Sequence, residues 1–574
     1  MYLQVSKSGG RPYLSIVHGY RDPVTKKVKH RTIQALGYLD ELTQTHPDPV
    51  AHFKEVVKTM NEAAALEKKP ITLNLDKNET LPEGQGNRKN LGYAALSRIY
   101  HKLDLATFFS NHSRPFKAKF NTNNIMKLLV FSRILAPASK KKTYEEKERY
   151  FENTDFSLDD VYRCLTQIVT FKDSLQLHLH RQVKETFGRS TESVFYDVTN
   201  YYFEIDKQDE LKRKGVSKEH RPDPIVQMGL LMDTNGIPIS YDLFPGNTND
   251  SETLMPVLAK VKKEYEVGRI IVVADKGINT ADNIAFYLAR GDGYVLSQTI
   301  RGGSKEIKEY VLNSEGYTGA GDGYKIKSRL YPREIAVSNA QGRRTKFRVD
   351  EKHVVFYSAD YDRKAKADRA PALQKARDLV KSPSRYNKAT SYGAAKYLKN
   401  LVFDPTTGEI VTTKQKPFFD EDKLREEEKF DGYYAIVTSE WQKSATEIVD
   451  IYRGLWRIEE AFKVTKSDLE ARPVYLSRHD HIQAHFLICF VALVIARLLA
   501  QSLDNKYSIA KIVESLNKAS GSRLEENWYV FDHADEITRA VSSTLDIDLS
   551  RKYLSLGDIK KILGASKKAS FCNN

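Results

Sequence analysis

The stretch from residue 193 to residue 298 constrains the fold of this chain most, because its apolar pattern changes between the period of strands and the period of helices. Strand-like runs lie at 193–205, 225–232, 237–244, 270–274 and 294–298, and helical patterns lie near 252–265 and 280–290. Three consecutive strands favour a meander, which is followed by helix, strand, helix and strand. The pattern predicts an α/β fold.

This order of elements is that of an RNase H-like core, and the segments around it differ in pattern. Before it we expect a small antiparallel β unit at 1–45, a helix and linker at 46–89, and a helical region at 90–190 that is either a DNA-binding domain or a plain spacer. The core would occupy 191–300 and 432–500, with a mostly β insertion at 301–431 and a C-terminal helical region at 501–574.

Basic residues exceed acidic ones, with 90 Lys and Arg against 75 Asp and Glu and a formal charge of +15. This excess favours an anionic partner, nucleic acid first. Residues 301–400 hold 23 Lys and Arg against 11 Asp and Glu, so most of the surplus lies in the predicted insertion. Either the insertion grips DNA, with Tyr and Phe interleaved among the basic side chains, or it is a solvated decoration.

Three further features concern the compartment. The cysteines, Cys164, Cys489 and Cys572, are too few and too far apart for a disulfide framework or a zinc site, which indicates a reducing compartment. The first residues show no apolar segment behind a basic flank, so we expect no signal peptide and a cytoplasmic protein. The apolar stretch 486–496 is shorter than the ~20 residues of a spanning helix, so we expect a buried core helix and no membrane partner.

Two aspartates stand where a carboxylate needs an explanation. Asp197 lies in the middle of an apolar strand, where an ionised carboxylate without a partner is costly. Asp275 ends the hydrophobic run 269–274, and ligand-binding residues of α/β sheets collect at the carboxyl ends of strands. Each has an ordinary alternative, because an Asp at the end of a strand is commonly a helix cap or a turn residue.

A third carboxylate lies on a predicted helix. Ser444 and Glu447 have the spacing of a capping box, so the helix should begin at Ala445. Its core-facing stripe consists of Ile451, Leu455, Ile458 and Phe462, and a second line along its edge consists of Tyr452, Glu459 and Lys466. Glu459 would be half sheltered and face the sheet, whereas Glu460 would lie further toward solvent. The alternative is an ordinary amphipathic helix with a charged flank.

Two Asp and one Glu from a central strand, a neighbouring strand end and a later helix match the needs of two Mg²⁺ ions. Hard cations take oxygen ligands, and two ions roughly 3.5–4 Å apart activate one oxygen and stabilise the leaving one in a phosphoryl displacement. Such a site would cut or join phosphodiester bonds.

The surroundings of these acids resemble the bacterial insertion-sequence DDE transposases, in a group related to the IS-four family that has a Y-R-E-K helix signature. The similar segments are 132–140, 195–199, 215–218 with Pro222 and Asp223, Gln227 with Gly229 and Leu230, 236–238, 246–250, 273–277 and 452–466. The resemblance covers roughly residues 90–500.

The resemblance implies that Asp197, Asp275 and Glu459 are the catalytic, metal-binding triad of an RNase H-like fold, with two Mg²⁺ ions for which Mn²⁺ can substitute. It implies DNA contacts for Tyr452 and Lys466. The Arg of the signature falls on Leu455, so Arg453 and Arg457 are the candidates for its phosphate contact, although a helix places them on other faces.

The implied reaction is hydrolysis at the transposon ends followed by attack of the freed 3′-hydroxyl on target DNA, carried out by a homodimer that holds two ends. Two rivals stay open: a non-enzymatic DNA-binding protein derived from a transposase, and a structure-specific nuclease of the same fold. Additional basic residues follow the first strand, namely Lys212, Arg213, Lys214 and Lys218. They either hold phosphates near the site or belong to a solvated loop.

Overall fold

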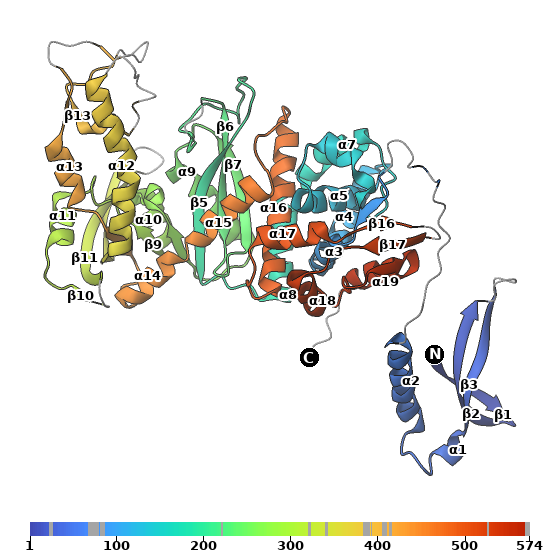
Figure 1. The fold of residues 1–574 in the computed structure, drawn as a ribbon. Coiled ribbons are helices and arrows are strands. Elements are labelled where there is room, and N and C mark those ends of the chain that lie inside the picture. Colours follow the sequence, from blue (N-terminus) through green and yellow to red (C-terminus); the bar gives the residue numbers. More distant parts are fainter. Residues whose placement is uncertain are drawn as a thin grey trace. The chain divides into compact units, whose positions relative to one another are not determined.

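The computed structural model describes residues 1–21, 27–66, 78, 80, 86–219, 222–319, 323–338, 343–382, 391, 393–403, 410–411, 416–524 and 527–568. The chain forms two compact units, Met1–Pro82 and Glu83–Asn574 (Figure 1).

The first unit contains the small antiparallel sheet that the sequence predicts. Its strands are β1 (Tyr2–Ser8), β2 (Arg11–Arg21) and β3 (Val28–Tyr38), and its helices are α1 (Leu39–Leu42) and α2 (Pro49–Leu66). Gly9 and Gly10 both have positive φ, +58° and +81°, the conformation that a two-residue turn between β1 and β2 requires. The amino group of Met1 donates a hydrogen bond to Asn61 of α2 (2.7 Å), which ties the helix to the sheet.

A nine-stranded sheet forms the centre of the second unit, in the order β10-β11-β12-β15-β9-β8-β5-β6-β7. The strands of the predicted core are β5 (Ser193–Tyr202), β6 (Ile225–Met232), β7 (Pro238–Pro245), β8 (Ile271–Ala274) and β9 (Gly293–Ser297). β5, β6 and β7 pair as an antiparallel meander, and β8 and β9 run parallel to β5. The predicted sequence of strands and helices is confirmed, with α9 (Asp250–Glu264) and α10 (Ala281–Leu288) in the expected places.

The two faces of this sheet pack against different helices. Alternate residues of a strand point to opposite faces. Val194 and Tyr196 of β5 belong to a core that includes residues of α9 and α10. Phe195 and Tyr201 belong to a second core, which includes residues of α15 (Trp456–Lys463) and α16 (His479–Ser502). Asp197 has the parity of Phe195 and therefore points toward the face that α15 covers.

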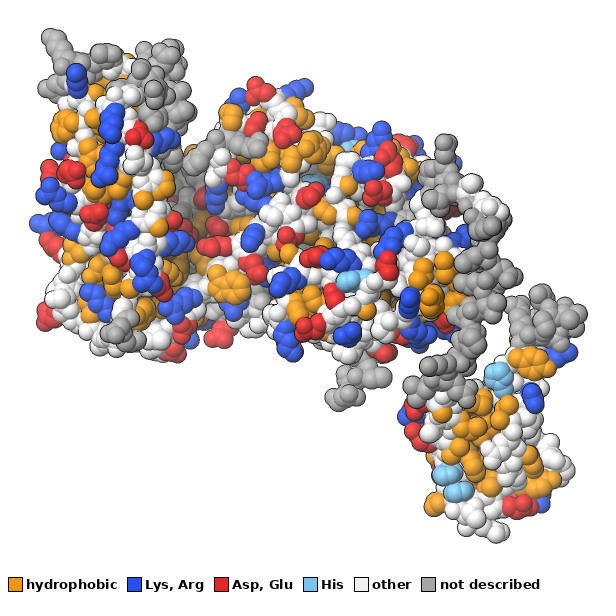
Figure 2. All heavy atoms as spheres, in the orientation of Figure 1, with side chains coloured by type: hydrophobic (Ala, Val, Ile, Leu, Met, Phe, Trp, Pro, Cys, Tyr) orange, Lys and Arg blue, Asp and Glu red, His pale blue; other side chains and the backbone are white. Residues whose placement is uncertain are grey.

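The insertion extends the same sheet and is not mostly β, which corrects the prediction for 301–431. The strands that extend the sheet are β10 (Thr318–Gly319), β11 (Tyr324–Ser338) and β12 (Arg344–Ser358), and β15 (Tyr433–Thr438) returns to β9. β13 (Leu398–Lys399) and β14 (Phe418–Phe419) form a separate two-stranded sheet. The helices of the insertion are α11 (Lys305–Leu312), α12 (Ala359–Lys381) and α13 (Glu421–Glu428). The 23 residues of α12 are rich in Ala, Lys and Arg, which are strong helix formers. Figure 2 shows basic side chains over this lobe.

Residues 90–190 are helical, as predicted. The helices are α3 (Tyr93–Lys102), α4 (Leu105–Ser113), α5 (Thr122–Leu135), α6 (Lys140–Glu145), α7 (Leu158–Ile168) and α8 (Lys172–Phe187). They share one hydrophobic core with α16. α16 has the length and hydropathy of a membrane span, but 89% of its apolar window is buried inside the protein, which agrees with the predicted core helix.

The C-terminal region is not only helical. It contains α17 (Ile509–Lys518), α18 (Glu536–Leu545) and α19 (Leu556–Ser566), together with β16 (Ser520–Arg523), β17 (Trp528–Phe531) and β18 (Tyr553–Ser555). These strands form a four-stranded sheet with β4 (Arg88–Asn90), in the order β18-β17-β16-β4. The prediction missed them because strands of three or four residues show too few alternations to be recognised.

Candidate active site

Asp197 and Asp275 lie side by side at the centre of the sheet. β5 and β8 are parallel neighbours whose last paired residues are Tyr196 and Ala274; Asp197 follows within β5, and Asp275 follows directly after the end of β8. Paired strands lie about 4.8 Å apart. The Asp197 carboxylate accepts a hydrogen bond from the Val198 amide (2.7 Å). The Asp275 carboxylate accepts one from the Ser297 hydroxyl (2.6 Å). The fold thus brings together two acids that are 78 residues apart.

The negative charge of Asp197 is only partly compensated by its surroundings. Burial raises its pKa to about 6, and the negative charges of Asp275 and Asp250 act in the same direction. Lys218 opposes this shift, but its Nζ lies 3.9 Å from the carboxylate and also donates to the Val198 carbonyl. Two neighbouring carboxylates whose negative charge is only partly compensated fit a hard divalent cation, which takes oxygen ligands.

Glu459 stands on the helix that covers this face. That helix is α15; the preceding helix, α14 (Ala445–Arg453), begins at Ala445 with the predicted Ser444–Glu447 capping box. Glu459 is exposed and makes no hydrogen bond or ion pair with any described residue. Within the described ranges, no three His, Cys, Asp or Glu side chains lie close enough to hold one metal ion. Two of the three predicted ligands are therefore adjacent, and Glu459 stands apart from them.

The single helix predicted across 445–466 is wrong, because it is interrupted twice. α14 ends at Arg453, α15 begins at Trp456, and a π-helical turn follows at Val464–Asp468. A Cβ on Gly454 would lie 2.4 Å from the ring of Phe195, so the junction crosses β5 at a distance that only glycine permits. Tyr452, Glu459 and Lys466 consequently do not share one helical line.

Glu460 also differs from its prediction. It is less exposed than Glu459, because its carboxylate accepts a hydrogen bond from Arg497 of α16 (2.8 Å). The spacing along the sequence predicted Glu460 to be the more exposed of the two acids. That prediction is wrong, because the contact with α16 comes from a segment distant in the sequence. The ion pair with Arg497 occupies Glu460, whereas Glu459 has no ion pair with a residue that the structure describes.

The two residues of the signature helix that the resemblance assigns to DNA already have protein partners. The Tyr452 hydroxyl hydrogen-bonds the Tyr434 hydroxyl (2.8 Å). Lys466 donates to Glu219 (3.2 Å), and burial lowers its pKa. Arg453 is exposed and lies near Asp450, with 3.5 Å between nitrogen and oxygen. Arg457 is half-buried near the Phe195 and Trp456 rings.

The basic residues after β5 have separate environments. Lys212 is buried, and its ammonium contacts Asp209 (3.1 Å) and the Ser477 carbonyl (3.3 Å), so it does not face solvent. Arg213 and Lys214 are exposed, and Lys214 pairs with Asp206 (2.7 Å). Lys218 is the member of this group that contacts the site, through Asp197 and Val198.

Sequence reasoning missed a cavity beside Glu459. It has a volume of about 690 Å³. Its aromatic lining residues are Phe356, Tyr361, Phe430, Tyr433, Tyr434, Tyr452 and Trp456, and its charged ones are Arg301, Lys364, Asp368, Arg453 and Glu459. The members come from α12, β12, β15 and the α14–α15 junction, and no local pattern predicts their meeting. Rings beside cations are a lining that suits nucleotide bases and phosphates.

A second cavity of about 610 Å³ begins at the residues that follow Asp197 in β5. Its lining includes residues 198–200, Lys218, 246–251 and Gly277. Asp250 belongs to it, with its Cβ and one carboxylate oxygen 3.9 Å from the position of a Cβ on Gly277. The similar segment 246–250 was noted in the sequence, but nothing there assigned a role to Asp250. The structure places this third carboxylate close enough to raise the pKa of Asp197.

Replacing Asp197 with Asn is expected to stabilise the protein without metal at neutral pH, by up to roughly 3 kcal/mol. The folded pKa of about 6 exceeds the ordinary value of 3.8, so the unfolded carboxylate loses its proton first and wild-type stability falls between these pH values. Thermal unfolding at pH 4 and pH 7.5 in the presence of EDTA measures the effect. Asp282→Asn, at an exposed position of α10, is the control. The same pH dependence in Asp197→Asn and wild type would contradict the assignment.

Two family matches identify the family. Residues 3–69 match the IS1634 family transposase N-terminal domain, and residues 203–495 match the transposase DDE domain. The second match spans just over half of the chain and includes Asp275 and Glu459, and it begins six residues after Asp197. No curated protein matches the chain. The resemblance to insertion-sequence transposases is thus confirmed, and the chain belongs to the DDE transposase family.

Proposed function

We propose that this protein cuts the ends of its own insertion sequence and joins the freed 3′-hydroxyls to target DNA, on an RNase H-like core formed by β5–β9. The observation that carries the proposal is the position of Asp197 and Asp275 directly after Tyr196 and Ala274, the last paired residues of two parallel strands, where burial raises the pKa of Asp197. Divalent cations bound there would activate the attacking oxygen and stabilise the leaving one. Mg²⁺ is the proposed ion, and Mn²⁺ a substitute.

Glu459 completes the proposed triad by moving toward the aspartates when DNA and metal bind. Two facts support this step: Glu459 is exposed without a partner among the described residues, and its helix packs on the sheet face toward which Asp197 points. Glu460 is held by Arg497 and is not proposed. Asp197, within β5, and Asp275, directly after β8, would give the site its rigid half.

The cavity beside Glu459 is the proposed place for the DNA end. Its rings would stack on bases, and Arg301, Lys364 and Arg453 would neutralise phosphates. Arg213, Lys214, Lys218, Arg457 and Lys466 are further proposed contacts, whereas the burial of Lys212 removes it from the proposal. We further propose that the protein works as a homodimer that holds two ends, in the cytoplasm and at the nucleoid.

Metal binding distinguishes this function from that of a non-enzymatic DNA-binding protein derived from a transposase. Isothermal titration with Mn²⁺ is expected to show binding to the wild type that is weakened about tenfold or more in Asp197→Asn and in Asp275→Asn, because each variant loses a charged ligand. Asp282→Asn should bind like the wild type, since this residue lies in the first turn of α10 and is exposed. Equal Mn²⁺ affinity in all four proteins would contradict the proposed site.

A further inference from the structure

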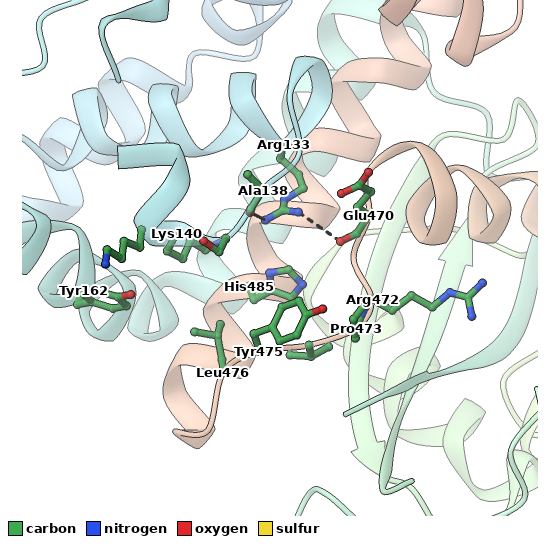
Figure 3. A pocket seen from close by; sticks show the side chains of 13 residues that line it. Arg133, Ala138, Lys140, Tyr162, Glu470, Arg472, Pro473, Tyr475, Leu476 and His485 are labelled. Carbon is green, nitrogen blue, oxygen red and sulfur yellow. Dashed lines mark hydrogen bonds between the residues drawn. The ribbon is translucent and has the colours of Figure 1, made fainter. Parts of the chain in front are cut away.

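Segment 132–140, one of those that resemble insertion-sequence transposases, takes no part in the proposed active site. Several of its residues line a separate pocket. The end of α5, the start of α6, residues 470–476 and His485 of α16 line a cavity of about 220 Å³ (Figure 3). This volume is below the roughly 300–1,000 Å³ typical of sites for drug-sized ligands, so the pocket suits a small group.

Arg133 forms one wall of this pocket. It is 5% exposed, and its guanidinium donates to the carbonyls of Ala138 (2.9 Å), Leu469 (3.2 Å) and Glu470 (3.3 Å). These bonds fix the α5–α6 turn to the segment that follows the Glu459 helix. Neutral carbonyls hold the guanidinium in place without cancelling its charge, and its buried Nε has no hydrogen-bond partner among the described residues.

Lys140, at the start of α6, lies in the same pocket. It is 5% exposed and makes no hydrogen bond or ion pair with any residue that the structure describes. Burial lowers its pKa to about 7, and the charge of Arg133 acts in the same direction. An ammonium group in this position is largely removed from bulk water and has no counterion among the described residues, and such burial is costly.

No acidic side chain compensates these two cations within the described part of the chain. Glu470 is the one acid in the pocket lining, and it contacts Arg133 through its carbonyl, as the dashed line in Figure 3 marks. Arg472 extends away from Arg133 and Lys140, and its guanidinium pairs with Glu219. His485 is bonded to the Ala471 carbonyl (3.1 Å).

We propose that this pocket, named here the Arg133–Lys140 pocket, binds a phosphate group, with Lys140 as the donor and Arg133 as the fixed neighbouring charge. The phosphate is either a free ion or part of a DNA strand. The second source rests on the proposed function. In that case the pocket would hold a DNA strand against the helical region, next to the segment that follows the Glu459 helix.

The test compares wild type, Lys140→Met and Lys142→Met. Met keeps the length of the side chain without its charge, and Lys142 is an exposed residue of the same helix that does not line the pocket, so it serves as the control. Differential scanning calorimetry in sodium phosphate and in sodium chloride at equal ionic strength measures anion binding to the folded state. Phosphate should raise the unfolding temperature of wild type and Lys142→Met, and have at least about tenfold weaker apparent affinity for Lys140→Met.

Fluorescence anisotropy with labelled DNA from the flanks of this protein's gene distinguishes the two sources. Competition by phosphate, together with weaker DNA binding by Lys140→Met than by Lys142→Met, assigns the pocket to a DNA phosphate. Phosphate binding without competition assigns it to the free ion. If Lys140→Met does not fold, Lys140→Gln replaces it. Equal stabilisation of wild type and the Lys140 variant by phosphate, or none in either, overturns the proposal. These two experiments measure binding and not cleavage. A failure of the proposed transposase activity would therefore be seen in the cleavage assay and would leave the result for the pocket unchanged.

Discussion

Replacing Glu459 with Gln is expected to lower the rate of metal-dependent DNA-end cleavage by about 10³-fold or more, and Asp197→Asn and Asp275→Asn should have the same effect. Metal ions in such sites contribute several kcal/mol of transition-state stabilisation, and each 1.4 kcal/mol or so is a factor of about ten in rate. Quantified cleavage of end DNA in Mg²⁺ measures the loss. DNA binding should persist in each variant, because the substitutions remove no positive charge.

The matched control is Glu460→Gln on the next residue. Glu460 binds Arg497 and has no role in the proposed chemistry, so this variant should retain cleavage within about tenfold of wild type, with some loss of stability. Loss of cleavage in Glu460→Gln with retention in Glu459→Gln would reverse the assignment of the two acids.

Replacing Gly454 with Ala is expected to destabilise the protein by about 1–3 kcal/mol and to lower cleavage by about 10²-fold. The added Cβ would lie 2.4 Å from the Phe195 ring and 2.9 Å from an Arg457 nitrogen, so α15 must shift away from β5. Glu459 moves with this helix, and misplacement of a catalytic group by about 1 Å is enough for a loss of this size. Denaturant unfolding and the cleavage assay measure the two effects.

Gly564→Ala is the control for helical glycines. Gly564 lies within α19 and a Cβ there would meet nothing within 4 Å, so the substitution should stabilise by about 0.5–1 kcal/mol. The double variant Gly454→Ala with Phe195→Leu, which replaces the ring by a smaller side chain, should recover part of the lost cleavage. Unchanged stability and cleavage in Gly454→Ala alone would contradict the close packing of α15 on β5.

The sheet and its two aspartates were predictable because their determinants are local. The unbroken apolar run that ends at Asp275 marks a strand covered on both faces, and Asp197 stands out as a charge inside another apolar strand. Once the strands pair in parallel, the register places the two acids together. The capping box that starts α14 was read correctly for the same reason, since its two partners are three residues apart.

The parts that were missed depend on contacts between distant segments. The interruption at Gly454 comes from the Phe195 ring, more than 250 residues earlier, and the state of Glu460 depends on Arg497. The aromatic cavity gathers residues from α12, β12, β15 and the α14–α15 junction. Charge counting over 301–400 found the basic surplus but could not separate the helix α12 from the hairpin β11–β12, because charge does not determine secondary structure.

The most direct test of the central claim is product analysis on DNA that carries the flanks of this protein's gene, incubated with Mg²⁺ and a target plasmid, for wild type, Asp197→Asn and Asp275→Asn. The account predicts nicks at the element ends and joined products with wild type, and neither product with the two variants, all three proteins binding the DNA. Binding without cleavage by the wild type in Mg²⁺ and Mn²⁺, or end-specific cleavage that survives in either variant, would contradict it.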